Sequence, residues 1–322
     1  MGTPLWHDFG MPKAPDAGWR TIAAATATAC ALAALTGCAT PGAAAPTLAD
    51  DDRPLLVATF TVIADLAREV AGDAARVESL TRPGVEVHDY EPTPGDLVRT
   101  EGADLVVTNG MGIDDWLLTL VERADAPHVV LSEVVEPIPI ETGHYAGNPN
   151  AHAWVSPAEG ARYVEALRVA MGDLMPAERA AIDDRAAAVT AQLEGLGERL
   201  REGVAALPAA RRVLVSCEGA FSYLARDAGL AEASLWPVNA GGQGTPQSIA
   251  QVAAVVEATG VPTVFCESTT HPGTQQQIAR NAGVRFDGSL HVDSLSAPDG
   301  PAPSYLALLE HDIDAILEGL GG

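Results

Sequence analysis

Apolar residues along this chain fall into two kinds of pattern, short continuous runs and longer stretches at helical spacing. Continuous apolar runs predict strands that are buried on both faces. The expected strands cover 55–60, 76–80, 103–108 and 128–131, and later 213–216, 233–236, 262–265 and 284–286. Helical spacing is found between them, at 61–70, 93–100, 114–123, 157–174, 221–228, 246–259, 274–281 and 304–317. Strands that alternate with helices predict an α/β fold of two lobes, each with a mainly parallel four-stranded sheet and helices on both faces.

A long helical segment separates the two strand–helix series. Residues 176–206 hold a helical pattern in spite of three glycines, and their apolar positions are Ile182, Ala186, Val189, Leu193, Leu196, Leu200 and Val204. Roughly 30 helical residues span about 45 Å. A peripheral helical hairpin or coiled coil would give the same pattern, but the second strand–helix series favours one backbone helix that joins two lobes. We therefore expect an N-terminal lobe over 54–175, a linking helix over 176–207 and a C-terminal lobe over 208–322.

The N-terminal residues follow neither pattern. Lys13 and Arg20 precede an Ala/Leu/Thr-rich run over 21–35, which is too short for a permanent membrane span and is typical of a secretory signal. The run ends in Leu35-Thr36-Gly37-Cys38, which resembles the lipobox that lipoprotein signal peptidase cuts. An ordinary signal peptide or an apolar core helix would explain the run but not all four of these positions.

The lipobox gives the expected compartment. We expect a lipoprotein signal peptide over 1–37 and lipidation of Cys38, which would anchor an extracytoplasmic protein to the cell membrane. Residues 38–53 are rich in Ala, Pro and Thr and show no apolar periodicity, so we expect a disordered tether there.

The net charge of the chain bears on whether it binds nucleic acid. The formal net charge is −24. The only lysine is Lys13, in the expected signal peptide, so all cationic side chains of the mature chain other than histidine are arginines. Such a surface repels phosphate backbones, so we expect no nucleic-acid partner.

Two cysteines, Cys217 and Cys266, remain after the signal segment and the lipid acceptor are set aside. Each lies in an apolar strand-like run directly before a glutamate. In an oxidising compartment they could pair, but the sequence alone does not give their separation, so a disulfide stays open beside the favoured alternative of two buried free thiols. Alternation along a strand would also point Cys217 away from Glu218, which argues against it as a soft metal ligand.

Four metal-capable side chains, His88, His152, Glu218 and Asp293, are spaced about evenly along the mature chain. No helix or hairpin can bring such distant residues together, so only a folded, two-lobed architecture could make them converge. Two imidazoles and two carboxylates suit Mn²⁺, Fe²⁺ or Zn²⁺ better than Ca²⁺ or Cu(I). Taken singly, each has a simpler explanation, as a solvated loop histidine, a residue at a helix start or a turn residue.

The segments around these residues carry a family resemblance. They are Val87-His88-Asp89-Tyr90-Glu91-Pro92, Asn150-Ala151-His152-Ala153-Trp154-Val155-Ser156-Pro157, Val215-Ser216-Cys217-Glu218-Gly219-Ala220-Phe221, Trp236-Pro237-Val238-Asn239 with Gly244-Thr245-Pro246, and His291-Val292-Asp293-Ser294-Leu295. In this order they resemble the motifs of cluster A-I (ZnuA/TroA/PsaA-like) metal-binding lipoproteins, the solute-binding receptors of manganese, iron and zinc ABC importers. The resemblance covers nearly the whole mature chain. It implies that the four side chains converge on one ion in a cleft between the lobes.

The resemblance also implies supporting residues and two departures. Residues expected to hold the ligands by hydrogen bonds are Tyr90, Glu91, Asn239 and His291. Other histidines, including His271, match no ligand position. Ala151 stands where proline usually precedes the second histidine, and Val87 where proline or serine commonly precedes the first. Both change backbone stiffness beside a ligand.

The third ligand position bears on the metal. Zinc receptors of this family usually carry histidine there, whereas manganese and iron receptors carry glutamate, and this chain has Glu218. Two carboxylates allow five or six ligating atoms, which suits Mn²⁺ or Fe²⁺, whereas a third imidazole would suit tetrahedral Zn²⁺. We expect Mn²⁺ first, with Fe²⁺ or Zn²⁺ as alternatives.

The implied function is transport, with an ABC permease and its ATPase as partners of a monomeric receptor that is not an enzyme. A metal-dependent hydrolase is the rival class, because two histidines and a carboxylate also describe hydrolytic sites. The chain has no HExxH, no Gly-rich phosphate loop and no GxSxG. An adhesin that uses the same fold is the third alternative.

Overall fold

The computed structural model describes residues 51–322, apart from residues 89, 118–120, 122–125, 144 and 238–243. The expected signal peptide, most of the tether and Cys38 therefore lie outside the described residues. Residues Asp51–Gly322 form one compact unit. Within this described part, no helix has both the length and the apolar composition needed to cross a membrane.

The first half of this unit is built on a four-stranded parallel sheet. Its strands are β1 (Leu55–Ala58), β2 (Arg76–Ser79), β3 (Leu105–Thr108) and β4 (His128–Val130). They lie in the order β2-β1-β3-β4, and all three pairings are parallel. The connecting helices are α1 (Thr61–Ala71) and α2 (Pro94–Glu101). A 3₁₀ turn at Asp115–Leu117 occupies the start of the helix expected over 114–123, half of which lies outside the described residues.

The second half repeats the arrangement with a break in the middle. Its strands are β5 (Val213–Glu218), β6 (Ala231–Trp236), β7 (Thr263–Glu267) and β8 (Arg285–Leu290). The strands pair in parallel as β5-β6 and β7-β8, and β5 contacts β7. The expected four-stranded layer is therefore made of two hydrogen-bonded pairs. The helices are α6 (Ser222–Ala228), α7 (Pro246–Thr259), α8 (Gly273–Ala282) and α9 (Tyr305–Gly321).

A disulfide joins the two strands at this break. Cys217 on β5 and Cys266 on β7 are bonded, with their Cα atoms 4.8 Å apart, within the range that disulfides require. Both side chains are fully buried. The favoured alternative of two free thiols was wrong, and the disulfide that the sequence left open is formed, because the distance between cysteines 49 residues apart in the chain depends on how the sheet assembles. A bonded Cys217 also cannot serve as a thiolate ligand.

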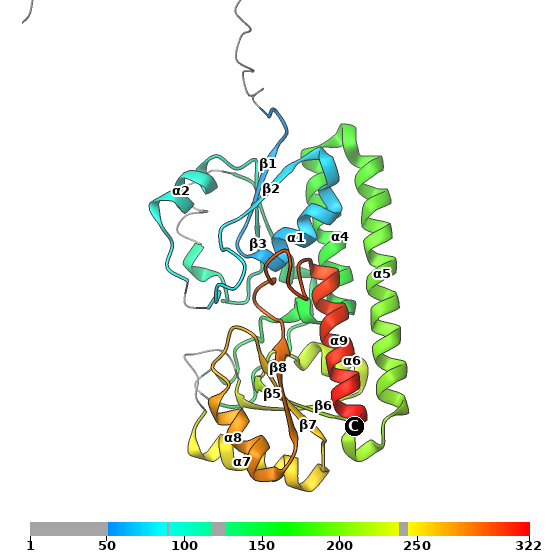
Figure 1. Cartoon of the computed structure of the whole chain (residues 1–322). Coiled ribbons are helices and arrows are strands. Elements are labelled where there is room, and N and C mark those ends of the chain that lie inside the picture. The colour runs from blue at the N-terminus through cyan, green and yellow to red at the C-terminus, as the bar shows by residue number, and fades with distance from the viewer. Residues whose placement is uncertain (1–50, 89, 118–120, 122–125, 144, 238–243) are drawn as a thin grey trace, which may run out of the picture. The chain divides into compact units, whose positions relative to one another are not determined.

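One long helix runs along both halves (Figure 1). After a 3₁₀ turn at Pro176–Glu178, α5 covers Arg179–Ala206 and lies antiparallel beside α4 (Pro157–Leu174). It contacts α1 and α4 of the first half and α6 and α9 of the second. Six of the seven apolar positions predicted for its inner face are buried, and Leu196 is partly buried. Gly203 lets α9 approach closely, since a Cβ there would lie 2.5 Å from Leu317 Cδ2.

Local signals explain where several helices begin. Thr93 and Thr245 form capping boxes at the starts of α2 and α7, each followed by proline in the first turn. Ser156 caps α4 by accepting from the backbone N–H groups of Ala158 and Glu159. Such caps stabilise a helix by about 1 kcal/mol each. The Ser156 cap also fixes the point at which the segment carrying His152 enters α4.

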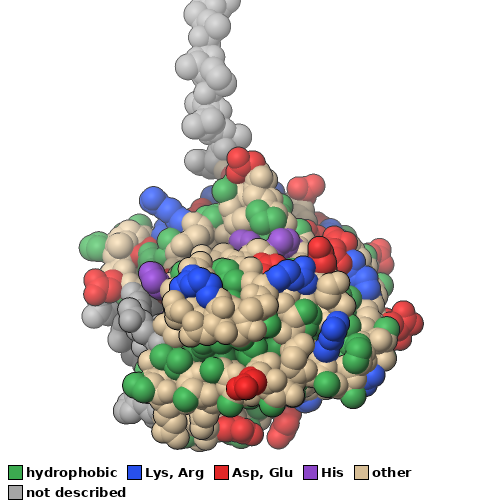
Figure 2. All heavy atoms as spheres, turned by 60° about the horizontal axis from the view of Figure 1, so that its bottom comes forward, with side chains coloured by type: hydrophobic (Ala, Val, Ile, Leu, Met, Phe, Trp, Pro, Cys, Tyr) green, Lys and Arg blue, Asp and Glu red, His purple; other side chains and the backbone are tan. Residues whose placement is uncertain are grey.

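The surface agrees with the acidic composition. On the described part of the face in Figure 2, arginine side chains are separated from one another by acidic, apolar and uncharged groups.

Candidate metal centre

Four chain segments, far apart in the sequence, come together at one place in the folded unit. His88 lies in the loop after β2, and His152 lies in the loop that leads through a 3₁₀ turn into α4. Glu218 is the last residue of β5, and Asp293 follows β8. Parallel strands present such residues at their carboxyl ends, where α/β proteins bind ligands. One potential ligating atom from each of the four lies within 4.8 Å of those of the others.

The spacing of these atoms is that of a coordination shell. His88 Nε2 lies 3.2 Å from His152 Nε2. Glu218 Oε1 is 3.5 Å from each of these two nitrogens. Bonds of about 2.1 Å in a tetrahedral shell put neighbouring ligand atoms about 3.4 Å apart. One transition-metal ion would therefore fit among these atoms without large movements.

Asp293 faces both imidazoles. Its Oδ1 lies 3.6 Å from His152 Nε2, and its Oδ2 lies 3.9 Å from His88 Nε2. Neither oxygen accepts a hydrogen bond from an N–H or hydroxyl group of the described residues. A buried carboxylate without donors is costly unless a cation balances it. With both oxygens turned to the site, Asp293 can bind an ion through one or both of them.

Burial sets the electrostatics of the centre. His152, Glu218 and Asp293 are no more than 1% exposed, while the side chain of His88 is 10% exposed. Burial, helped by the neighbouring His88, lowers the pKa of His152 well below its usual value. Burial and the nearby carboxylates of Glu86 and Glu267 raise the pKa of Asp293 well above its usual range. A neutral imidazole is the metal-binding form, so this environment favours a cation over protons on His152.

Asn150 orients the imidazole of His152. The Asn150 side-chain oxygen accepts from the backbone N–H of His152 at 3.1 Å and lies 2.8 Å from its ring Nδ1. Because the oxygen is an acceptor, Nδ1 carries the proton and the lone pair of Nε2 faces the site. The sequence analysis missed Asn150. A polar amide two residues before the histidine in the same motif was the available signal.

Two further carboxylates that were missed lie beside the ligands. Glu267 at the end of β7 accepts from the backbone N–H of Glu218 at 3.2 Å. Its complete burial raises its pKa to about 8. Glu86 accepts from the backbone N–H of His88 at 3.2 Å. The only signal for Glu267 in the sequence was its position directly after Cys266, which matches that of Glu218 after Cys217. Its hydrogen bond with Glu218 depends on β5 lying beside β7.

Hydrogen bonds also tie the ligand-bearing segments to one another. The Trp154 indole donates to the carbonyl oxygen of Val292 at 2.9 Å. The Tyr305 hydroxyl on α9 donates to the carbonyl oxygen of Trp154 at 2.6 Å. The backbone N–H of Leu295 donates to the hydroxyl of Thr61 at the start of α1 at 3.0 Å. These bonds join the two halves next to the centre.

The other predicted site residues have different surroundings. The Tyr90 hydroxyl donates to Asp96 of α2 at 3.0 Å, and Glu91 is exposed. His291 directly follows β8, which ends at Leu290. The His291 ring lies 3.1 Å from the Ser268 hydroxyl. Asn239 lies outside the described residues, so the predicted supporting role of this group stays a prediction.

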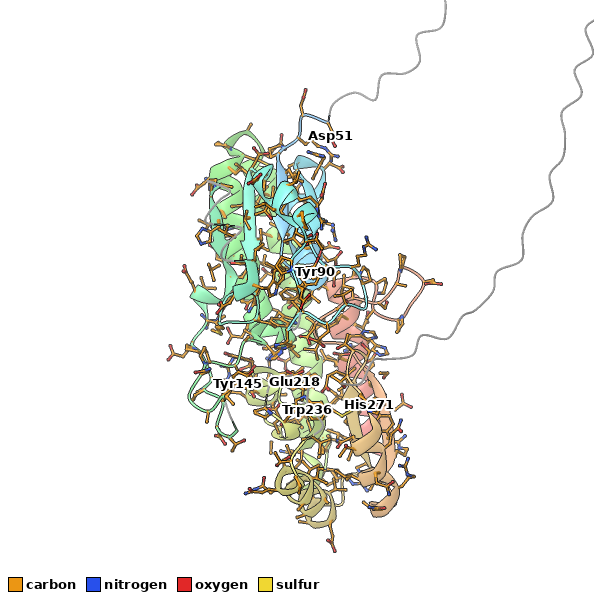
Figure 3. All side chains as sticks on the ribbon, turned by 90° about the vertical axis from the view of Figure 1, so that its left-hand side faces the viewer. Asp51, Tyr90, Tyr145, Glu218, Trp236 and His271 are labelled. Atoms are coloured by element: carbon orange, nitrogen blue, oxygen red, sulfur yellow. A yellow bond between two sulfur atoms is a disulfide. The ribbon has the colours of Figure 1, made fainter. Side chains whose placement is uncertain are left out.

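The remaining predictions concern residues around the centre. His271 lies apart from Glu218, whereas Trp236 pairs with Glu218 at the ends of β6 and β5 (Figure 3). Val87 is fully buried in the core, and Ala151 is 6% exposed. The two departures from the family motifs therefore place small or medium apolar side chains in packed positions.

Comparisons with known proteins show which family the chain resembles. The family model described as "ZnuA: Zinc-uptake complex component A periplasmic" matches residues 56–319. The protein named iron-binding protein YfeA of Yersinia pestis is 42% identical over 267 residues, which cover 83% of this chain and 86% of that protein. The protein named manganese-binding lipoprotein MntA of Halalkalibacterium halodurans is 28% identical over 266 residues, 82% of this chain and 88% of that one.

Solved structures share the fold. The Mn-bound periplasmic metal-binding protein from Candidatus Liberibacter asiaticus superposes with a TM-score of 0.78 at 27% identity, covering 83% of this chain and all of that one. The periplasmic zinc-binding protein TroA from Treponema pallidum superposes with a TM-score of 0.75 at 26% identity, covering 83% and 99%. These matches confirm the predicted α/β fold with its long helix, and the family match over 56–319 shows that the chain belongs to the ZnuA family of periplasmic metal-uptake components.

Proposed function

We propose that this protein is an extracytoplasmic receptor that captures one divalent transition-metal ion and delivers it to an ABC permease driven by its ATPase. The observation that supports this most is the cluster of His88, His152, Glu218 and Asp293, whose facing atoms lie 3.2–3.9 Å apart in the pairs measured. In this proposal the ion is the cargo, and the four side chains are its ligands.

Mn²⁺ is the cargo we propose first, with Fe²⁺ or Zn²⁺ as alternatives. Glu218 and Asp293 together offer up to four oxygens, which permits five or six coordination. The relatives agree in part, since one is named iron-binding and another manganese-binding. Zn²⁺ binds most such sites more tightly than Mn²⁺, so selectivity for Mn²⁺ would have to come from geometry and supply.

Transport fits the centre better than catalysis. A catalytic metal keeps a coordination position open to substrate. Here three of the four proposed ligands are almost completely buried, and the fourth is 10% exposed. A hydrolase would need a path for water and substrate to the ion. No contact in the described residues favours the adhesin alternative.

We further propose that release involves local movement of ligand-bearing loops while the two lobes, 54–175 and 208–322, stay nearly fixed. Helix α5 (Arg179–Ala206) packs against helices of both lobes, and we expect a helical link of this kind to resist wide hinge opening. The bonds from Trp154 to Val292 and from Leu295 to Thr61 also cross between the halves. Protonation of the histidines at low pH would assist release.

Anchoring through lipidated Cys38 completes the proposal, with residues 38–53 as the tether and a monomer as the working form. The Leu35-Thr36-Gly37-Cys38 run supports it. A lipid anchor would hold the receptor close to the permease and raise its local concentration there.

Metal analysis tests the proposal. The protein would be purified without added metal, its metal content measured, and the metal-free form titrated with Mn²⁺, Fe²⁺ and Zn²⁺ in competition. We expect one ion per chain and loss of binding when His152 is replaced by alanine. Failure of the intact protein to bind any of the three ions would refute the proposed function.

A further inference from the structure

The side-chain amide of Asn150 forms a bridge between two ligand-bearing segments. Its oxygen accepts from the backbone N–H of His152 at 3.1 Å and lies 2.8 Å from His152 Nδ1. Its nitrogen donates to the carbonyl oxygen of Gly219 at 2.6 Å and to the Ser222 hydroxyl at 3.1 Å. Asn150 is 3% exposed, so its amide makes all four bonds away from solvent.

These partners determine which end of the Asn150 side-chain amide is the oxygen and which is the nitrogen. A backbone N–H only donates and a backbone carbonyl only accepts. The Asn150 oxygen must therefore face His152, and its NH₂ group must face Gly219. Asn150 therefore accepts hydrogen bonds from the His152 segment and donates one to the Gly219 segment. A side chain that could only accept or only donate would bind only one of the two segments.

The two segments carry ligands from different halves of the fold. His152 precedes α4, whereas Gly219 directly follows Glu218 at the end of β5. His152 Nε2 lies 3.5 Å from Glu218 Oε1. One rigid amide thus connects the backbone next to Glu218 with the ring of His152.

A second hydrogen bond holds Asn150 itself in place. The Tyr223 hydroxyl on α6 donates to the backbone carbonyl oxygen of Asn150 at 2.7 Å and accepts from the Ile138 N–H at 3.1 Å. The Ser222 hydroxyl donates in turn to partly buried Glu232 at 2.6 Å. The bridge is therefore anchored on the C-terminal half by both backbone and side chain.

We propose that Asn150 is the positioning residue that sets the distance between His152 and Glu218, so that these two ligands meet an arriving ion as a preformed pair. The inference rests on the proposed function, because it assigns a role to Asn150 within that same centre. Asn150 itself does not touch the ion. It acts by fixing the imidazole proton on Nδ1 and by holding the Glu218–Gly219 turn against the His152 segment.

Replacement by aspartate tests the bridge with little change of shape. In the Asn150→Asp variant, the carboxylate still accepts from His152 but cannot donate to the carbonyl oxygen of Gly219, which it would repel. Residues that orient metal ligands typically contribute about 10–100-fold to metal affinity. We expect the affinity for Mn²⁺ to fall at least tenfold. We also expect the visible absorption spectrum of the Co²⁺-loaded protein to change, because that spectrum reports coordination geometry.

Thr263 supplies the control. It lies at the start of β7, at the opposite end of the strand from the metal centre, and its buried hydroxyl donates to the carbonyl oxygen of Gly319 at 2.7 Å. The Thr263→Val variant keeps the shape of the side chain and should lower the melting temperature, because it removes a buried hydrogen bond. Its Co²⁺ spectrum and its Mn²⁺ affinity should match those of the unmodified protein.

The outcomes separate this inference from the proposed function. If the unmodified protein binds no transition metal, the proposed function fails first. If it binds, but Asn150→Asp retains both affinity and Co²⁺ spectrum, the bridge is refuted, and Asn150 serves only to orient His152. A lower melting temperature with unchanged affinity and spectrum would likewise overturn the inference. Reduced affinity and an altered spectrum in Asn150→Asp alone would support it.

Discussion

Removing the Cys217–Cys266 disulfide should destabilise the protein strongly. The bond closes a loop with a sequence separation of 49 residues. The chain-entropy relation for such a loop gives about 4 kcal/mol at 25 °C. The bond also lies where β5 and β7 contact each other without pairing as strands of one sheet, so no hydrogen-bonded ladder replaces it there.

Replacing both cysteines with alanine removes the cross-link while keeping small apolar side chains in a fully buried position. For a unit of this size, about 4 kcal/mol corresponds to a drop in melting temperature of roughly 10 °C. Urea unfolding of the metal-free oxidised protein and of the double variant would measure the difference. Dithiothreitol-treated protein should behave like the variant.

Two results would refute this reasoning. One is an unfolding midpoint of the double variant equal to that of the oxidised protein. The other is reaction of Cys217 or Cys266 with a thiol reagent in the denatured protein before any reduction, because bonded cysteines offer no thiol.

Further predictions concern the ligands, pH and anchoring. Asp293→Asn should weaken Mn²⁺ binding by at least a hundredfold in a competition titration, whereas His271→Ala should leave it unchanged; equal effects would contradict the assignment of Asp293 as a ligand. The pKa of Glu267 is raised from its usual 4.5 to about 8, so its stabilising contribution is complete below about pH 4.5 and is lost as the pH rises through 8. The melting temperature of the metal-free protein should therefore fall between pH 5 and pH 8.5, and Glu267→Gln should flatten this fall; a curve as steep as before would argue against Glu267 as the source. Cys38→Ser should block processing or release the protein from membranes, and unchanged membrane fractionation would exclude the lipid anchor.

Local sequence patterns predicted the elements well, because strands and helices respond to neighbouring residues. The continuous apolar runs at β1 and β3 predicted buried strands; β3 is buried throughout, and β1 is buried at three of its four residues. The spacing of Ile182, Val189 and Leu200 predicted the inner face of α5, which packs as expected. In the helix expected over 114–123, the described residues include a 3₁₀ turn at Asp115–Leu117, and residues 118–120, 122 and 123 lie outside the described part.

The convergence of the candidate ligands was predicted through a family resemblance and not through local physics. Nothing in the neighbourhood of His88 or Asp293 distinguishes a ligand from an ordinary loop residue. Five motifs in order supplied that information. The structure then added the distances, the burial and the orientation of Asp293 toward both imidazoles.

What only the tertiary structure decided were contacts between residues far apart in the chain. The disulfide depends on β5 lying beside β7, and the Asn150 bridge depends on α4 and β5 meeting at one edge. Glu267 acquires its raised pKa only when folding removes it from water. The sequence alone determined which side chains were available and which elements carried them. Their distances, partners and protonation depended on the packing of the two halves, since hydrogen bonding and desolvation act through space and not along the chain.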